Sequence, residues 1–193
     1  GNLRSVYNAF RYIGQDAAIC RSPEELDGAD RLVFPGVGNA GDVINGLRSS
    51  GLDKAILRAI GEGVPFLGIC VGLQMLFSST EEAEGAECMG LVGGRVRRFP
   101  RQKALKVPQI GWNTVSVRNR DCPLFKGIKD DPYFYFVHSY YCESEEPDTT
   151  AGVTEYGVKY TSALWKDNIF AVQFHPERSQ DNGLKMLGNF AEI

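Results

Sequence analysis

Residues 66–77 of the chain read FLGICVGLQMLF, and this stretch decides the fold class. Its first four residues form a fully apolar run, which is typical of a strand buried on both faces of a sheet. Its last five residues follow a helical pattern after the second glycine. A buried strand that runs directly into a helix is the repeating unit of sheets whose parallel strands are joined by helices. The stretch therefore predicts an α/β domain.

The sequence around this stretch repeats the same alternation through the first half of the chain. Apolar residues recur at helical spacing from Leu3 to Ile13 and stop at Gly14, which suits the end of a helix. We expect helices at 3–13, 22–25, 41–49 and 52–60, and strands at 17–20, 31–34 and 66–69. Short apolar strands separated by helices predict a mostly parallel sheet that is covered by helices on both faces.

The second half of the chain has a different pattern, since strand-like runs follow one another with few helical intervals. We expect strands at 95–99, 114–117, 133–137, 162–165 and 169–174, and one closing helix at 181–191. Strands joined without helices are usually antiparallel, so these strands should extend or flank the parallel sheet. No internal repeat, low-complexity stretch or linker interrupts the chain, and we expect a single domain over residues 1–193.

The composition excludes several classes of protein. With 21 Lys and Arg against 24 Asp and Glu, the formal net charge is −3, which argues against a nucleic-acid partner. The five cysteines are odd in number and contain no C-x-x-C pair, so neither a disulfide framework nor a cysteine zinc site is expected. The chain contains no P-loop and no dinucleotide turn. No cofactor and no metal are expected. No apolar run could span a membrane and no signal segment opens the chain, so we expect a cytoplasmic protein.

Cys70 stands at the turn between the strand and the helix of residues 66–77, in the pattern G-x-C-x-G. This is the context of a nucleophile elbow, in which the reactive side chain sits on a sharp and strained turn. Glycine is required at positions 68 and 72 for steric reasons, because Cβ atoms on Gly68 and Gly72 would collide with neighbouring segments. The helix N-terminus favours a thiolate, which predicts Cys70 as a nucleophile. The alternative is a buried structural cysteine, the commonest fate of a free thiol.

A thiol nucleophile needs a base, and the chain has two histidines. His175 follows the apolar strand that ends at Phe174, where open α/β sheets place their active sites. Glu177 can hold the tautomer of the imidazole, as the acid of a catalytic triad does. His138 also follows an apolar run but has no acid nearby, so we expect it to have a packing or hydrogen-bonding role.

The tetrapeptide Pro35-Gly36-Val37-Gly38 ends the strand expected at 31–34. Its two glycines can free a backbone N–H to point into a cleft, as an oxyanion hole requires. By itself this signal is weak, since most Pro-Gly pairs are simple turns.

Taken in this order, the PGVG, GICVGLQ and FHPE segments resemble those of the class I, or triad, glutamine amidotransferases. Within that family, the segments 1–6, 108–113 and 135–140 are similar to those of the glutaminase subunits of imidazole glycerol phosphate synthase. The resemblance covers the whole chain. It implies the family's fold without its first strand, because members begin with a strand and a short loop before the Gly-Asn found at 1–2. A second departure is Gln109, where we expect a histidine.

The resemblance implies that the chain hydrolyses L-glutamine to glutamate and ammonia. Cys70 would attack the side-chain amide, and His175, oriented by Glu177, would move the proton. The oxyanion would be held by backbone N–H groups of Val37, Gly38 and Val71. The α-amino and α-carboxylate groups of glutamine would be contacted by Gln74, Glu82, Ser139 and Tyr140. For Glu82, the alternative is a solvated member of the acidic run at 81–84.

The resemblance also implies a partner in a heterodimer, a (β/α)8-barrel cyclase that uses the ammonia to make imidazole glycerol phosphate in histidine biosynthesis. Free ammonia would protonate and diffuse away, so a separate glutaminase has to dock over its acceptor enzyme. The residues expected at this interface are Trp112, Asn113, Tyr135 and Arg178. Trp112 and Tyr135 could instead be core aromatics.

Three alternatives stay open. The chain could be a glutaminase that serves another acceptor, such as a sugar-modifying amination system. It could be a cysteine hydrolase or stress protein with the same elbow, although Glu177 after His-Pro argues against this. It could also be a catalytically silent binding protein, which the complete set of Cys70, His175 and Glu177 disfavours.

Overall fold

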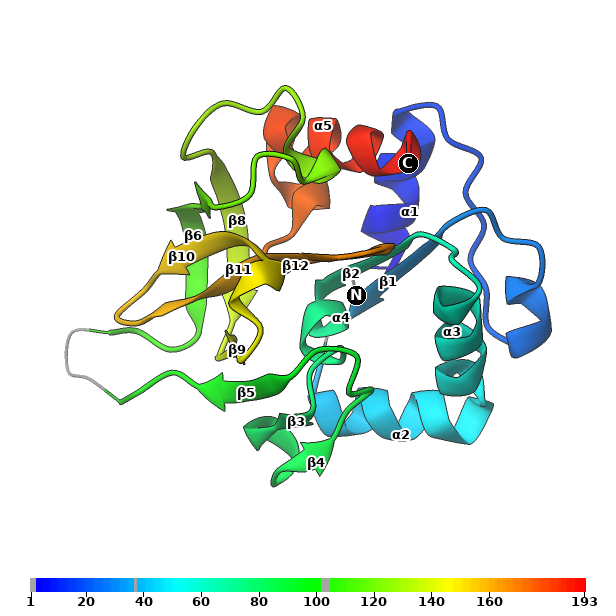
Figure 1. Cartoon of the computed structure of the whole chain (residues 1–193), viewed down its shortest axis with the longest axis horizontal. Coiled ribbons are helices and arrows are strands. Elements are labelled where there is room, and N and C mark those ends of the chain that lie inside the picture. Colours follow the sequence, from blue (N-terminus) through cyan, green and yellow to red (C-terminus); the bar gives the residue numbers. More distant parts are fainter. Residues whose placement is uncertain (1–2, 37, 102–104) are drawn as a thin grey trace.

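The computed structural model describes residues 3–36, 38–101 and 105–193 (Figure 1). Its first described element is the helix α1 (Leu3–Tyr12). Within the described residues, ten strands form one mixed sheet, and two further strands, β6 (Gln109–Thr114) and β8 (Tyr133–His138), pair with each other.

Three parallel strands form one end of the sheet, in the order β1 (Leu32–Gly36), β2 (Phe66–Cys70) and β12 (Ile169–Val172), with β1 outermost. All the residues of β2 are buried, as its unbroken apolar run predicts. The register pairs Gly36 with Cys70, so the carboxyl ends of β1 and β2 meet at one edge of the sheet. The loop after β12, which carries His175, leaves from the same edge.

Antiparallel strands extend the sheet outward from β12. In spatial order they are β11 (Lys159–Lys166), β9 (Tyr140–Ser144) and β5 (Gly94–Arg98), followed by the short β3 (Ser79–Thr80) and β4 (Ala86–Glu87), while β10 (Thr150–Glu155) and β7 (Ser116–Val117) branch from β11. Of these strands, only β3 runs parallel to its neighbour β5. The expected antiparallel extension in the second half of the chain is confirmed.

Helices cover both faces of the three parallel strands. α1 and α5 (Gln180–Ala191) lie on one side of them and α3 (Leu52–Gly61) lies on the other, directly after α2 (Ala40–Ser50) (Figure 1). Each face of the sheet carries its own hydrophobic core, and alternate residues of β2 contribute to the two cores. Leu67 packs with α1 and α5, whereas Phe66 packs with α3. This arrangement confirms the predicted α/β fold.

The remaining helical segments are short. They are the α-helical turn α4 (Val71–Gln74) and the 3-10 helices η1 (Pro23–Leu26), η2 (Glu81–Ala83), η3 (Pro123–Phe125), η4 (Pro147–Thr149) and η5 (Pro176–Arg178). In the described part of the chain, no helix combines the length and the apolar character that crossing a bilayer requires.

The expected helices at 3–13, 41–49, 52–60 and 181–191 are confirmed, and three other segments differ from expectation. The strand expected at 114–117 is divided, because β6 ends at Thr114 and β7 (Ser116–Val117) pairs in the other sheet. Residues 17–20 do not form a strand, because their side chains are half-buried or exposed and no described strand pairs with them. The helix expected to reach Phe77 ends at Gln74. The apolar residues that follow Gln74 are fully buried in the core, so their pattern reflects packing and not a longer helix.

Candidate active site

Cys70 occupies the sharp turn between β2 and α4. Its backbone has φ +57° and ψ −106°, a combination that non-glycine residues rarely adopt, so the turn is strained. A Cβ atom on Gly68 would lie 2.7 Å from the backbone of Gly72, and one on Gly72 would run into the carbonyl oxygen of Phe34. The steric reason for the G-x-C-x-G pattern is therefore confirmed.

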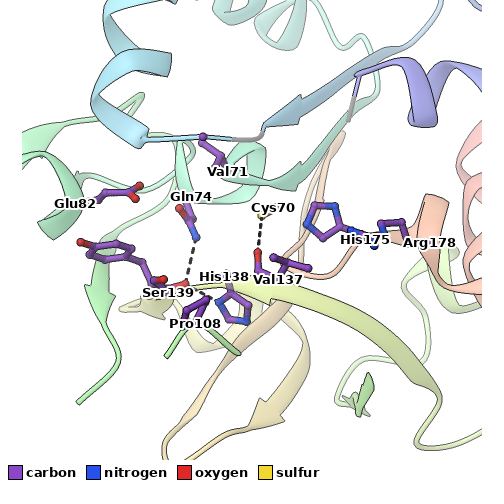
Figure 2. A pocket seen from close by; sticks show the side chains of 12 residues that line it. Cys70, Val71, Gln74, Glu82, Pro108, Val137, His138, Ser139, His175 and Arg178 are labelled. Atoms are coloured by element: carbon purple, nitrogen blue, oxygen red, sulfur yellow. Dashed lines mark hydrogen bonds between the residues drawn. The ribbon is translucent and has the colours of Figure 1, made fainter. Parts of the chain in front are cut away.

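The Cys70 side chain lies at the wall of a pocket, with its sulfur 3.8 Å from the carbonyl oxygen of Val137 (Figure 2). Because α4 is a single turn, the dipole of a long helix is not available to favour the thiolate. Gly38 lines the same pocket with a φ of +111°. Val37, the third residue expected at the oxyanion, lies outside the described residues.

His175 enters the pocket from the loop that follows β12. Its Nδ1 lies 3.0 Å from Oε1 of Glu177, and both side chains are almost wholly buried. The carboxylate thus holds a proton on Nδ1 and leaves Nε2 as the nitrogen that can exchange a proton with Cys70.

The loop that carries His175 is fastened to β8. The backbone N–H of His175 donates to the carbonyl oxygen of Tyr135 at 2.8 Å. The Ser179 hydroxyl donates to the carbonyl oxygen of His175 at 2.7 Å and accepts from the backbone N–H of Tyr135 at 3.0 Å. Ser179 is a residue that the sequence analysis misses, because no local pattern links it to a strand more than forty residues away.

The charge state of His175 depends on its two partners. Burial alone would lower its pKa, but hydrogen bonds with Cys70 and Glu177, and the charges of both groups, outweigh burial and raise the pKa from its ordinary 6.5 to about 9. The imidazolium is therefore favoured at neutral pH. A protonated imidazole beside the sulfur is the arrangement that activates a cysteine nucleophile.

His138 has a different environment. Its Nδ1 donates to the carbonyl oxygen of Tyr140 at 2.7 Å, and its Nε2 lies 3.3 Å from the hydroxyl of Tyr160. Burial lowers its pKa from 6.5 to about 4; the hydrogen bond to Tyr140 opposes this shift and the nearby His175 adds to it. Neutral, packed and hydrogen-bonded through Nδ1, His138 has the role expected for it.

The pocket around Cys70 and His175 has a volume of about 520 Å³, within the range of small-molecule sites. Most of the predicted site residues line it, namely Gly38, Cys70, Val71, Gln74, Glu82, Ser139, Tyr140, His175 and Arg178. They come from segments far apart in the sequence, which the edge of the sheet brings together (Figure 2). Glu177 lies behind His175 with no exposed side-chain surface.

Gln74 is held by hydrogen bonds on its amide nitrogen. Its Nε2 donates to the carbonyl oxygen of Tyr140 (dashed line in Figure 2) and to Oε1 of Gln173, each at 3.2 Å. The Nε2 of Gln173 lies 3.6 Å from the sulfur of Cys70. Gln173 is fully buried, and the sequence analysis does not identify it, although it stands two residues before His175.

Glu82 is not merely a solvated member of an acidic run. Its Oε2 accepts a hydrogen bond from the backbone N–H of Ala40 at 2.9 Å, and its side chain also lines the pocket. The carboxylate is therefore fixed at the first residue of α2, with one face toward the ligand space.

Three of the residues expected at a partner interface form a contact group that includes Arg178, which lines the pocket. Arg178 stacks over the ring of Tyr135 at 4.4 Å, and Trp112 packs edge-on against the same ring. Trp112 is 46% exposed, so it is a surface residue and not a core aromatic. Asn113 points elsewhere, because its Nδ2 donates to the carbonyl oxygen of Glu155.

Comparison with known proteins identifies the family of this chain. Residues 2–193 match the family model for class I glutamine amidotransferases. Relatives named imidazole glycerol phosphate synthase subunit HisH are 48% identical in Thermococcus kodakarensis and 45% identical in Chlorobaculum tepidum. Each alignment covers 100% of this chain, and 95% and 96% of those proteins, respectively.

Solved structures support the fold alone. A chain in the structure of PurLQS from Thermotoga maritima superposes with a TM-score of 0.79 at 19% identity, covering 100% of this chain and 92% of that one. The glutaminase domain of CTPS from Trypanosoma brucei gives a TM-score of 0.66 at 18% identity, covering 98% of this chain and 86% of that one. With a family model matched over nearly all of its length, the chain belongs to the class I glutamine amidotransferases.

Proposed function

We propose that this chain is the glutaminase subunit of an imidazole glycerol phosphate synthase. It is a glutamine amidotransferase with a cysteine nucleophile, and it acts in histidine biosynthesis. The observation that carries its chemistry is the meeting of Cys70 with the His175–Glu177 pair at the wall of one pocket. All 193 residues are taken to form a single amidotransferase domain.

The reaction runs in two halves. The Cys70 thiolate attacks the side-chain amide carbon of glutamine, and His175 donates a proton to the nitrogen as the carbon–nitrogen bond breaks and ammonia leaves. A glutamyl thioester remains on Cys70. Water then attacks the thioester while His175 accepts its proton, and glutamate and the free sulfur are released. Glu177 keeps the imidazole in the tautomer that both halves need.

Negative charge develops on the amide oxygen in both halves. We assign its stabilisation to the Val71 N–H at the start of α4 and to N–H groups of Val37 and Gly38. Gly38 and Val71 support this assignment, because both line the pocket beside Cys70. An oxyanion donor is worth about 2.7–4 kcal/mol of transition-state stabilisation.

The α-amino and α-carboxylate groups of glutamine are assigned to the part of the pocket that is lined by Glu82, Gln74, Ser139 and Tyr140. The Glu82 carboxylate and the amide oxygen of Gln74 would accept hydrogen bonds from the α-ammonium group. Ser139, directly before β9, and Tyr140, the first residue of β9, would hold the α-carboxylate. Support comes from their shared lining of the pocket and from the fixed position of Glu82 at the start of α2.

The ammonia acceptor is proposed to be a (β/α)8-barrel cyclase subunit bound over the pocket in a heterodimer. An exposed apolar surface beside the pocket supports this, since Ile110, Trp112 and Tyr133 are 62%, 46% and 59% exposed. The pairing of β6 with β8 places these side chains on one face, next to Tyr135 and Arg178. Aromatic and arginine side chains of this kind are typical anchors of protein interfaces.

The decisive experiment measures glutamate release by the chain alone and with the cyclase and its phosphoribosyl ligand. Cys70→Ala should abolish release and leave the fold intact, because the backbone and the glycines set the elbow. Cys88→Ser is the matched control, since burial raises the pKa of that thiol to about 11 and keeps it unreactive. Glutamine turnover by Cys70→Ala would overturn the assignment.

A further inference from the structure

A continuous chain of hydrogen bonds connects the amino-acid end of the pocket to the nucleophile. It runs from the Gln74 amide to the Gln173 amide at 3.2 Å, and from Gln173 to the Cys70 sulfur at 3.6 Å. Gln173 belongs to no established part of the triad and lies fully buried behind the pocket wall. A buried amide of this kind connects the residue proposed to bind the substrate with the nucleophile.

The direction of donation along these hydrogen bonds is set by a backbone group at one end. The carbonyl oxygen of Tyr140 can only accept, so Gln74 has to present its Nε2 there. The second N–H of the same nitrogen meets Gln173, which has to present Oε1. The Nε2 of Gln173 is then turned toward Cys70, and its N–H donates to the sulfur.

Both N–H bonds of Gln74 are used by the protein, which leaves its Oε1 as the atom that can accept from a ligand. An ammonium group bound to that oxygen polarises the Gln74 amide and strengthens its bond to Gln173. The Gln173 N–H in turn becomes a better donor to the sulfur. Donation to a thiolate stabilises its charged, nucleophilic form.

We propose that Gln173 is a positioning residue that couples recognition of the glutamine α-ammonium group at Gln74 to the Cys70 sulfur. This inference rests on the proposed glutaminase function. It explains why an amide, which offers an acceptor and a donor on the same rigid plane, stands between Gln74 and Cys70. A buried apolar side chain at position 173 would fill the space without making either bond.

The test compares glutamine with glutaric acid monoamide, which is glutamine without its α-amino group. Ammonia release from both is measured for wild type, Gln74→Met, Gln173→Met and the double variant. Wild type should prefer glutamine, and Gln173→Met should reduce the ratio of the two kcat/KM values about 10-fold, the scale of one hydrogen bond to a charged group. The double variant should lose no more of this preference than Gln74→Met alone.

The matched control is Gln109→Met, because Gln109 is also a buried glutamine but bonds to the hydroxyl of Tyr160 instead. It should leave the preference unchanged, and thermal melting of all variants verifies that they fold. A second measurement follows alkylation of the Cys70 peptide by iodoacetamide at pH 7, which should slow in Gln173→Met and not in Gln109→Met.

The outcomes separate the inference from the proposed function. If Gln173→Met lowers turnover of both substrates equally and keeps the preference for glutamine, Gln173 has only a packing role and the inference is overturned. A wild-type chain that releases no ammonia from glutamine, alone or with the cyclase, would overturn the proposed function and this inference with it.

Discussion

The carboxylate of Glu82 accepts a hydrogen bond from the backbone N–H of Ala40 at 2.9 Å, which joins the amino-acid end of the pocket to the first residue of α2. The Asn39 side chain caps the next two N–H groups of this helix, so Glu82 serves the donor that Asn39 does not reach. The Glu82 carboxylate therefore has two roles: it caps the N-terminus of α2, and it is assigned to bind the α-ammonium group of glutamine.

Two substitutions of Glu82 separate these roles. Glu82→Gln keeps an acceptor for Ala40 but loses the negative charge, so KM for glutamine should rise about 10- to 100-fold with a smaller change in kcat. Glu82→Ala loses both, and should also reduce the free energy of unfolding by about 1 kcal/mol. Steady-state kinetics and thermal melting measure the two effects. An unchanged KM in Glu82→Gln would remove Glu82 from the substrate site.

Glu177→Gln tests the acid of the proposed triad. The amide keeps the size of the side chain but cannot hold a proton on Nδ1 of His175 as a carboxylate does. We expect kcat to fall by about 10²–10⁴, the scale of a lost tautomer in a triad. His138→Asn is the control and should cost far less, since both of its ring nitrogens already face Tyr140 and Tyr160. Equal losses in His175→Asn and His138→Asn would contradict the choice of base.

The raised pKa of His175 predicts a specific pH dependence of stability. Because the folded-state pKa of about 9 lies above the ordinary 6.5, the protonated imidazole stabilises the fold. That contribution is fully present below about pH 6.5 and is lost as the pH rises through about 9. Denaturant unfolding at several pH values should therefore show a decline across this window that His175→Asn lacks. Parallel curves for the two proteins would mean that the pKa is not raised.

The parallel strands and the nucleophile turn are predictable from the sequence because their signals are local. The strand, the two glycines and Cys70 lie within the single run 66–72, and steric crowding at Gly68 and Gly72 leaves one workable geometry. The run Phe174 to Glu177 similarly joins a buried strand end to a histidine and an acid two residues apart. Such patterns are visible without any knowledge of tertiary contacts.

The missed features depend on contacts between distant segments. Gln173 and Ser179 act through partners on α4, β2 and β8, which no periodicity reveals. The strands β9 and β10 do not emerge from the sequence, because their residues carry little apolar alternation and pair with strands set by the whole topology. The strand expected at 17–20 is wrong for the same reason, since a short apolar run does not show whether a neighbouring strand is there to pair with it.

Trp112 provides the most direct test of the proposed docking surface. It is 46% exposed and packs against Tyr135, which in turn lies under Arg178, a residue that lines the pocket. A large aromatic buried by the cyclase subunit is a typical hot spot, so Trp112→Ala should weaken binding of the cyclase about 30-fold. Tyr12→Ala is the matched control, because Tyr12 is 80% exposed at the end of α1 and should not affect the dissociation constant.

Titration calorimetry measures the dissociation constants of both variants, and glutamate release in the absence of the cyclase should be the same in Trp112→Ala as in wild type. If Trp112→Ala bound the cyclase as tightly as Tyr12→Ala does, the partner would have to dock elsewhere on the chain, and ammonia would need a different route out of the pocket.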